Sequence, residues 1–360
     1  MIRDMTPNRD AAAEPGGSIP SRMRAAWVSR FGLEHLSVVE APTPAPGQSE
    51  VLVRVTAASL NYRDLLVAKG EYNPRFPLPL ILGSDAVGVI AALGPGTADY
   101  GLAVGDRVCP IFAQGWLDGP PRRDATRATL GGPLPGVFAE YVVARANSVV
   151  RVPGRLADLD AACLPCAGVT AWSALKTLGD LRPGDVVLTQ GSGGVSVFAL
   201  QIARRAGARV IATTRDPEKR ERLLALGASH VLDATAPRWG EQARQLSGGE
   251  GVDHVIDVGG AGTLAESLAA VRPAGTISLI GTLGGSARSP SLLPAVMRNV
   301  RLQGVFVGHG RSFRELVAAY DAGGMRPVVD SVFPLERVAE AFARLASGRH
   351  FGKVCLQLAG

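Results

Sequence analysis

The sequence has few cysteines and no long apolar run, and each shortage excludes a class of protein. Four cysteines in 360 residues are too few for the disulfide scaffold that small secreted proteins use. No apolar stretch reaches the roughly 20 residues that a membrane-spanning helix needs. The first residues are polar, are interrupted by prolines and lack the apolar segment of a signal peptide. We therefore expect a cytoplasmic protein with no membrane partner.

The positive charge of the chain does not form the pattern of a nucleic-acid-binding protein. The net charge is +6, but the arginines are scattered along the sequence instead of gathering in a stripe. Apolar residues make up 46% and charged residues 19%, which is typical of a globular protein, and the length suits two domains. We expect an enzyme with a small-molecule substrate, in which part of the positive charge serves an anionic cofactor.

The first part of the chain is predicted to be rich in β-structure. Residues 1–22 are polar and broken by prolines and glycines, and we expect a flexible leader. Residues 114–136 hold several glycines and prolines and predict a long excursion loop. Between and around them, alternating or β-branched residues predict strands over 23–28, 51–57, 81–92, 106–111 and 138–143. Few helical signals occur before residue 155.

After residue 155 helical segments alternate with short apolar strands. This alternation predicts a parallel sheet with helices on both faces, and therefore an α/β fold with a doubly wound sheet. The predicted strands of this sheet are 185–189, 208–213, 252–258 and 276–281, and the predicted helices between them include 195–206 and 218–226. Beyond residue 307 we expect a helix over 312–322, a strand, a second helix over 335–347 and a last strand over 352–358.

A glycine-rich turn follows the first of these strands and precedes a helix. Gly191 permits a tight turn, and Gly193 lets the backbone approach a dinucleotide diphosphate closely. The start of the helix offers free N–H groups and the positive end of its dipole. The third glycine of the usual pattern is replaced by Ser196, so a glycine turn of another α/β fold is the alternative. We assign cofactor binding to residues Gly191, Ser192, Gly193, Gly194 and Val195.

The end of the second strand favours NADPH over NADH. An acidic residue that would bind the ribose 2′-hydroxyl of NADH is missing at the tip, where Thr214 and Arg215 stand instead. A hydroxyl and a guanidinium suit a 2′-phosphate, and Lys219 lies one turn further on. Asp216 weakens this interpretation, and a solvated charged turn is the alternative.

Six blocks of sequence occur in an order that resembles the medium-chain dehydrogenase/reductase superfamily, in particular its zinc-independent quinone and enone reductases. They lie at 61–64, 82–88, 105–108, 164–172, 279–284 and 350–353. The resemblance implies a GroES-like β-rich catalytic domain over 23–150 and 308–360. It implies a Rossmann dinucleotide-binding domain over 151–307. It also implies that NADPH delivers a hydride to a quinone or to an alkene conjugated with a carbonyl.

The resemblance further implies that no catalytic zinc is bound. Zinc-dependent relatives place a cysteine where this chain has Asn61 and a His-Glu pair where it has Ser84 and Asp85. Only Cys166 matches a ligand position, whereas a catalytic zinc needs three protein ligands. Without a Lewis acid, a readily reduced acceptor is a better substrate than a simple alcohol.

The remaining site residues are also assigned through the resemblance. Asn61 is a candidate catalytic and cofactor-binding residue near the nicotinamide ribose and the substrate, with an amide that only stabilises a turn as the alternative. Tyr72 is a candidate proton donor, with a non-catalytic pocket wall as the alternative. Lys353 contacts a cofactor phosphate, unless it is a solvated lysine. The other predicted cofactor contacts are Thr170, Gly259, Ile280, Gly281, Thr282, Phe306, Val307 and Gly308.

The sequence leaves two other functions as alternatives, and it suggests how two copies of the chain associate. The chain is alternatively an alcohol or aldehyde dehydrogenase of the same superfamily, or an NADPH-binding protein without significant turnover. The segment 301–305 resembles the strand that joins Rossmann domains edge to edge in this superfamily, which implies a homodimer. The sequence does not specify the physiological substrate.

Overall fold

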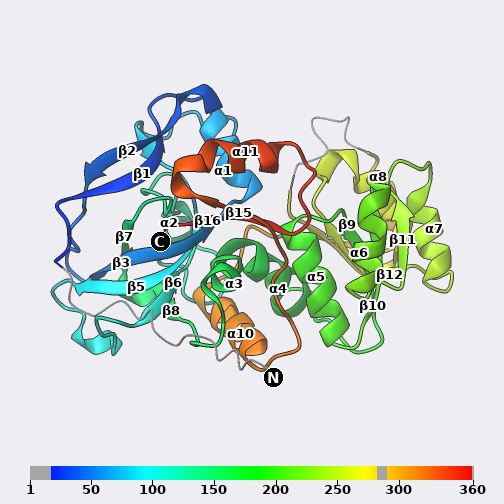
Figure 1. Cartoon of the computed structure of the whole chain (residues 1–360). Helices are drawn as coiled ribbons and strands as arrows, with labels where there is room; N and C mark the ends of the chain where they lie inside the picture. The colour runs from blue at the N-terminus through cyan, green and yellow to red at the C-terminus, as the bar shows by residue number, and fades with distance from the viewer. Residues whose placement is uncertain (1–17, 282–289, 359–360) are drawn as a thin grey trace, which may run out of the picture.

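The structure is a computed structural model that describes residues 18–281 and 290–358. In Figure 1, strands coloured blue and cyan form one half of the molecule, and elements coloured green to yellow form the other. The red C-terminal segment returns to the first half. Most of the predicted leader lies outside the described residues, since the description begins at Ser18.

A seven-stranded mixed sheet organises the first half. Its order is β15-β16-β3-β5-β6-β8, and β7 also pairs with β3. Because β16 pairs antiparallel with β3, the end of the chain completes the sheet begun near its start. The strands are β3 (Glu50–Ser59), β5 (Asp85–Leu93), β6 (Arg107–Pro110), β7 (Tyr141–Arg145), β8 (Val149–Arg151), β15 (Val329–Pro334) and β16 (Lys353–Gln357).

The prediction of one strand over 81–92 is wrong, because two strands of different sheets occupy this segment. A three-stranded sheet of β1 (Arg22–Val28), β2 (Leu36–Pro42) and β4 (Leu80–Ile81) takes Ile81, and β5 begins only at Asp85. Gly83 separates them with φ of +92°, a left-handed conformation that interrupts a strand. A Cβ at Gly83 would lie 2.3 Å from the ring of Phe138, so the break is also packed tightly.

The predicted doubly wound α/β fold is confirmed by a six-stranded sheet in the second half. Its order is β11-β10-β9-β12-β13-β14, and every pairing is parallel. The strands are β9 (Val186–Gln190), β10 (Arg209–Thr214), β11 (His230–Asp233), β12 (Val252–Asp257), β13 (Val271–Leu279) and β14 (Arg301–Gly304). Its helices are α5 (Gly194–Arg205), α6 (Arg220–Ala225), α7 (Trp239–Leu246), α8 (Leu264–Ala270) and α9 (Leu293–Met297).

Short helical segments connect the two sheets. One buried apolar cluster contains Ala57 and Val87 of the mixed sheet together with Val187 and Val210 of the parallel sheet, so the halves share a continuous core. The connecting helices are α3 (Asp158–Ala162), the π-helical turns Leu164–Gly168 and Ser173–Thr177, α4 (Val169–Trp172) and α10 (Gly310–Asp321). Helix α11 (Val338–Ala346) covers the mixed sheet and contacts β15 and β16.

Two helices occur where the sequence predicts few. Helix α1 (Tyr62–Lys69) starts with a capping box, in which the Asn61 N–H donates to Asp64 Oδ2 at 2.8 Å, and it ends at Gly70 with φ of +77°. Helix α2 (Arg123–Arg127) lies inside the predicted excursion loop. With eight and five residues, both helices are too short for a clear helical period.

Candidate active site

The glycine turn has the geometry expected of an anion site at a helix start. Gly191 adopts φ of +76°, and Gly193 precedes α5 without any side chain that caps the helix. The first N–H groups of α5 therefore remain available to a ligand. Ser196 donates through Oγ to the Gln190 carbonyl at 2.5 Å, so this serine ties the helix back to β9.

The carboxyl ends of β12 and β13 lie at the same edge of the parallel sheet as the glycine turn. The buried Asp257 carboxylate accepts hydrogen bonds from the N–H of Gly259 at 3.1 Å and from Ser267 Oγ at 2.6 Å. These bonds fix the loop that carries Gly259. Ile280 and Gly281 directly follow β13, and Thr282 lies outside the described residues.

Of the three residues predicted to bind a 2′-phosphate, only Arg215 leaves its donors open. Thr214 is buried, and its hydroxyl is bonded to the backbone of Asp216 at 3.1 and 3.2 Å. Lys219 donates through Nζ to the carbonyl oxygens of Gly348 and His350. Arg215 is exposed and forms no hydrogen bond or ion pair with the residues that the structure describes.

A buried polar centre lies under the first turn of α5. The Lys353 ammonium donates to the Leu60 carbonyl at 2.8 Å and to Asn61 Oδ1 at 2.5 Å, and it pairs with Asp85 Oδ2 at 3.3 Å. Only 3% of the Lys353 side chain and none of the Asp85 side chain are exposed. A Cβ at Gly194 would lie 2.8 Å from Lys353 Cδ. The centre thus joins the predicted residues Asn61 and Lys353 to the glycine turn.

The charges of this centre depend on one another. Burial raises the pKa of Asp85, and the Lys353 ammonium opposes that rise. Burial alone would lower the pKa of Lys353, but the Asp85 carboxylate opposes this effect, and the pKa of Lys353 is raised. With three acceptors around it, the Lys353 ammonium carries its charge.

A second carboxyl extends the centre towards α1. Burial raises the pKa of Asp64 to about 6, and its bond from the Asn61 N–H opposes the rise. Ser84 Oγ links the two sides, since it donates to Asp64 Oδ1 at 3.3 Å and accepts from Asn61 Nδ2 at 3.4 Å. Asp85 Oδ1 is buried without a hydrogen-bond partner among the described residues.

An aromatic cavity of about 620 Å³ holds two further predicted residues, Tyr72 and Phe306. Their side chains are 40% and 45% exposed. The excursion loop supplies much of the remaining wall, so this loop helps to shape the cavity. The lining also includes Asn73, Arg75, Phe76, Pro77, Pro121, Thr126, Arg127, Thr129 and Pro133.

Arg63 connects the residues on one side of this cavity, although no pattern in the sequence singles it out. Its guanidinium lies 4.6 Å from the ring centre of Tyr72 and 4.9 Å from that of Phe112. It also donates to the carbonyl oxygens of Leu130, at 3.1 Å, and Gly132, at 2.6 Å. Arg63 therefore attaches the excursion loop to α1.

The other predicted contacts lie around α4. Thr170 is buried in this helix, and a Cβ at Gly308 would lie 2.7 Å from the Val169 side chain. Val307 is buried in the core shared by the two halves. Gly308 therefore passes close to the helix that carries Thr170, and Phe306 points from the same segment into the aromatic cavity.

Known proteins resemble the chain over most of its length. The family model described as "Alcohol dehydrogenase GroES-like domain" matches residues 47–154, and the one described as "Zinc-binding dehydrogenase" matches 194–322. A zinc-type alcohol dehydrogenase-like protein of Schizosaccharomyces pombe is 40% identical over 337 residues, which cover 91% of this chain and 96% of the relative. The chain belongs to the medium-chain dehydrogenase/reductase superfamily. It is an NAD(P)-dependent oxidoreductase of this superfamily.

Solved structures agree with this assignment. A protein from Sinorhizobium meliloti 1021, assigned as an alcohol dehydrogenase, has a TM-score of 0.87 and 40% identity over 95% of this chain and all of its own. An NAD-dependent alcohol dehydrogenase has a TM-score of 0.84 and 36% identity over 94% of this chain and all of its own. A crotonyl-CoA carboxylase/reductase in complex with NADP has a TM-score of 0.85 and 25% identity, with 96% of each chain covered.

No helix in the described part of the chain is both long enough and apolar enough to span a membrane.

Proposed function

We propose that the chain transfers a hydride from NADPH to a quinone or an enone without a catalytic zinc ion. The observation that supports this most is the buried centre, in which the Lys353 ammonium is bonded to both Asn61 and Asp85. An ammonium group inside this centre repels a divalent cation, and the amide of Asn61 is a poor zinc ligand.

The donor set of the centre does not fit zinc in other respects. Of the positions that hold zinc ligands in zinc-dependent relatives, Cys166 alone keeps a ligating residue, whereas a catalytic zinc needs three protein ligands. Among residues 18–281 and 290–358, no group of three His, Cys, Asp or Glu side chains is placed to hold a metal ion. The proposed hydride transfer therefore involves no metal ion.

The aromatic cavity suits a flat acceptor. Bound at the glycine turn, NADPH supplies the hydride, and the chain has to bind and orient the acceptor beside it. Tyr72, Phe76 and Phe306 offer ring faces and edges on which a quinone can stack. The Tyr72 phenol, whose ring lies beside the Arg63 guanidinium, would give a proton to the reduced product.

Arg215 carries the proposed preference for NADPH. It is exposed at the end of β10, and a 2′-phosphate is the anion that its open donors would bind there. The NADP complex of the crotonyl-CoA carboxylase/reductase supports this choice, while the NAD-dependent alcohol dehydrogenase favours NADH.

A panel of acceptors tests the proposed reaction. Oxidation of NADPH is followed at 340 nm with quinones, enones and enoyl thioesters, and reduction of NADP⁺ is followed with primary and secondary alcohols. We expect turnover with at least one quinone or enone and none with the alcohols. The names of the relatives favour alcohol oxidation as a second function, and alcohol turnover that rises with added zinc would establish it instead. Tight NADPH binding without any turnover would identify a binding protein.

We also propose that two copies associate through β14. This strand is at the edge of the parallel sheet, and α9 beside it exposes apolar side chains. Val296 is 71% and Met297 73% exposed. Light scattering should give a dimer mass that falls to a monomer in V296E/M297E but not in V104E, which alters an exposed valine elsewhere. A monomeric wild-type protein would contradict the proposal.

A further inference from the structure

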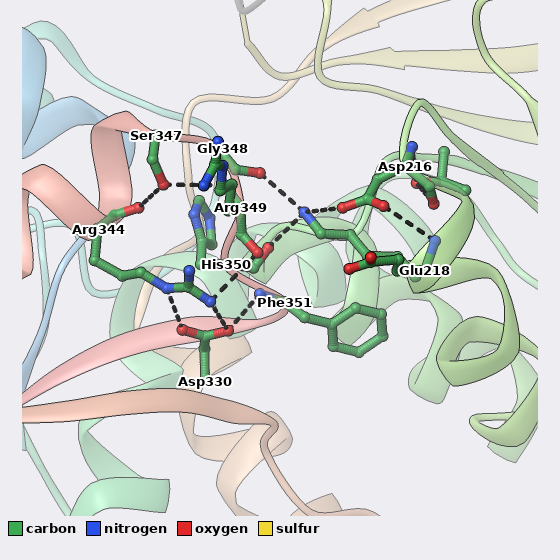
Figure 2. Close-up of polar contacts among 11 residues, drawn as sticks. Asp216, Glu218, Asp330, Arg344, Ser347, Gly348, Arg349, His350 and Phe351 are labelled. Carbon is green, nitrogen blue, oxygen red and sulfur yellow. Dashed lines mark hydrogen bonds and ion pairs between the residues drawn. The ribbon is translucent and has the colours of Figure 1, made fainter.

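The loop 347–351 joins α11 to β16 and reaches across to the parallel sheet. Immediately after it, the Gly352 N–H donates to the Ser192 carbonyl at 2.9 Å, and Gly352 forms a backbone bridge with Gly193. The loop belongs to the mixed-sheet half, yet it lies beside the glycine turn of the other half. Figure 2 shows it between the turn that carries Asp216 and the pair formed by Asp330 and Arg344.

One side of the loop is fixed by Asp330 on β15. The Phe351 N–H donates to Asp330 Oδ1 at 2.9 Å. Arg344 of α11 donates to both oxygens of the same carboxylate, at 2.8 and 2.9 Å. Only 4% of the Asp330 side chain is exposed, so this paired, charged anchor is strong.

The other side of the loop is fixed from the parallel-sheet half by Lys219, at the end of the 3₁₀ turn Pro217–Lys219. Lys219 Nζ donates to the carbonyl oxygens of Gly348 at 2.9 Å and His350 at 3.0 Å. The Lys219 side chain is only 10% exposed. Its donors hold the backbone of the loop, and this position sets where the His350 ring lies.

The His350 ring faces the glycine turn. Its Nε2 lies 4.0 Å from the position that a Cβ on Gly193 would occupy. Its Nδ1 is buried and has no hydrogen-bond partner among the described residues. Burial, followed by the charge of Lys219, lowers the pKa of His350 to about 4. A neutral, incompletely bonded imidazole therefore stands over the turn whose free N–H groups receive a diphosphate.

We infer that His350 is a ligand of the cofactor diphosphate, held over the glycine turn from the other half of the molecule by Lys219 and Asp330. The imidazole donates a hydrogen bond to a diphosphate oxygen, and the backbone N–H groups of α5 bind the remaining oxygens. The inference rests on nicotinamide dinucleotide binding, and it holds for NADH and NADPH and for any hydride acceptor.

Proton uptake on binding is a second consequence. The charged groups around the ring are Lys219 from the 3₁₀ turn, Asp330 from β15, Arg344 from α11 and Lys353 from β16. A bound diphosphate adds negative charge, so it raises the pKa of His350 above its value of about 4 in the free protein. Affinity should therefore increase as the pH falls through the raised value, and the complex should take up a proton.

Calorimetric titration without any acceptor tests the inference. The ligands are ADP-ribose, whose internal diphosphate does not titrate near neutral pH, and adenosine 2′-phosphate, which has no diphosphate. We expect H350F to weaken the binding of ADP-ribose, NADH and NADPH about ten-fold each, which corresponds to the loss of one charge-assisted hydrogen bond. Adenosine 2′-phosphate should bind unchanged. H350Q keeps a hydrogen-bond donor and should lose less affinity than H350F. H230F is the matched control, because His230 lies away from the loop.

Unchanged ADP-ribose binding by a folded H350F protein would overturn the inference, as would equal losses for adenosine 2′-phosphate. Wild-type binding of ADP-ribose should also tighten between pH 7.5 and 5.5, and H350F should lack this increase. Identical pH profiles would contradict the role of the imidazole. Because the assay contains no acceptor, its outcome does not depend on the proposed quinone or enone reduction.

Discussion

Removing Lys353 should destabilise the protein because it leaves the Asp85 carboxylate buried and without its cation. The ammonium lies 3.3 Å from Asp85 Oδ2, and the two side chains are 3% and 0% exposed. Breaking a buried ion pair by removing one partner costs about 3–5 kcal/mol. We expect K353M to lower the free energy of unfolding by that amount, and D85N to lower it by a similar amount.

The double variant D85N/K353M distinguishes an interacting pair from two independent residues. With both charges removed, no unpaired charge stays buried, so the double variant should be no less stable than either single variant. The assay is urea unfolding at pH 7.5, followed by tryptophan fluorescence. Losses that simply add in the double variant would refute the coupling between Lys353 and Asp85.

The pH dependence of K353M provides an internal check. Lys353 lowers the pKa of Asp85, so without it the pKa of Asp85 in the folded state rises further above the ordinary value of 3.8. A raised carboxyl pKa means that the folded state binds the proton more tightly, and stability therefore increases as the pH falls. The deficit of K353M relative to wild type should be smaller at pH 5 than at pH 8. A constant deficit would show that Asp85 is not the destabilised group.

Three other predictions concern single residues. R215A should raise the KM for NADPH about ten-fold or more and leave that for NADH unchanged, and equal effects would contradict the 2′-phosphate contact. Y72F should slow enone reduction about 100-fold without changing NADPH affinity, with Y100F as the control; an unchanged rate would leave Tyr72 as a cavity wall. Because Asp64 has a pKa of about 6, above the ordinary 3.8, its contribution to stability falls as the pH rises through this range. In urea unfolding, the free energy of unfolding of D64N should fall less with rising pH than that of the wild type. An identical fall in both proteins would show that a group other than Asp64 causes it.

The sequence predicts well those features that local pattern determines. The parallel sheet follows from apolar strands alternating with helices, and the turn Gly191–Gly193 follows from glycines between a strand and a helix. The break at Gly83 is not predicted, although Gly83, Ser84 and Asp85 interrupt the apolar residues, because a glycine inside a strand pattern also indicates a bulge within one strand. The close approach of the Phe138 ring, which leaves no room for a Cβ at Gly83, comes from a residue far away in the sequence.

Contacts between distant residues account for most of what the sequence does not predict about the site. Lys353 resembles a phosphate contact or a solvated lysine, but its carboxylate partner is 268 residues away. The lysine at 219 suggests a 2′-phosphate ligand, yet its donors bind a loop about 130 residues further on. Arg63 acquires its role only when the excursion loop folds back over α1. No periodicity or spacing in the sequence records these pairings.

The proposed hydride transfer from NADPH to an activated acceptor needs no catalytic metal. Its most direct test measures the zinc content of the purified protein and its turnover of the best quinone or enone, before and after dialysis against a strong chelator. We predict substoichiometric zinc and the same turnover number in both samples. One zinc bound per chain, with activity lost on chelation and restored by zinc, would contradict hydride transfer without a metal.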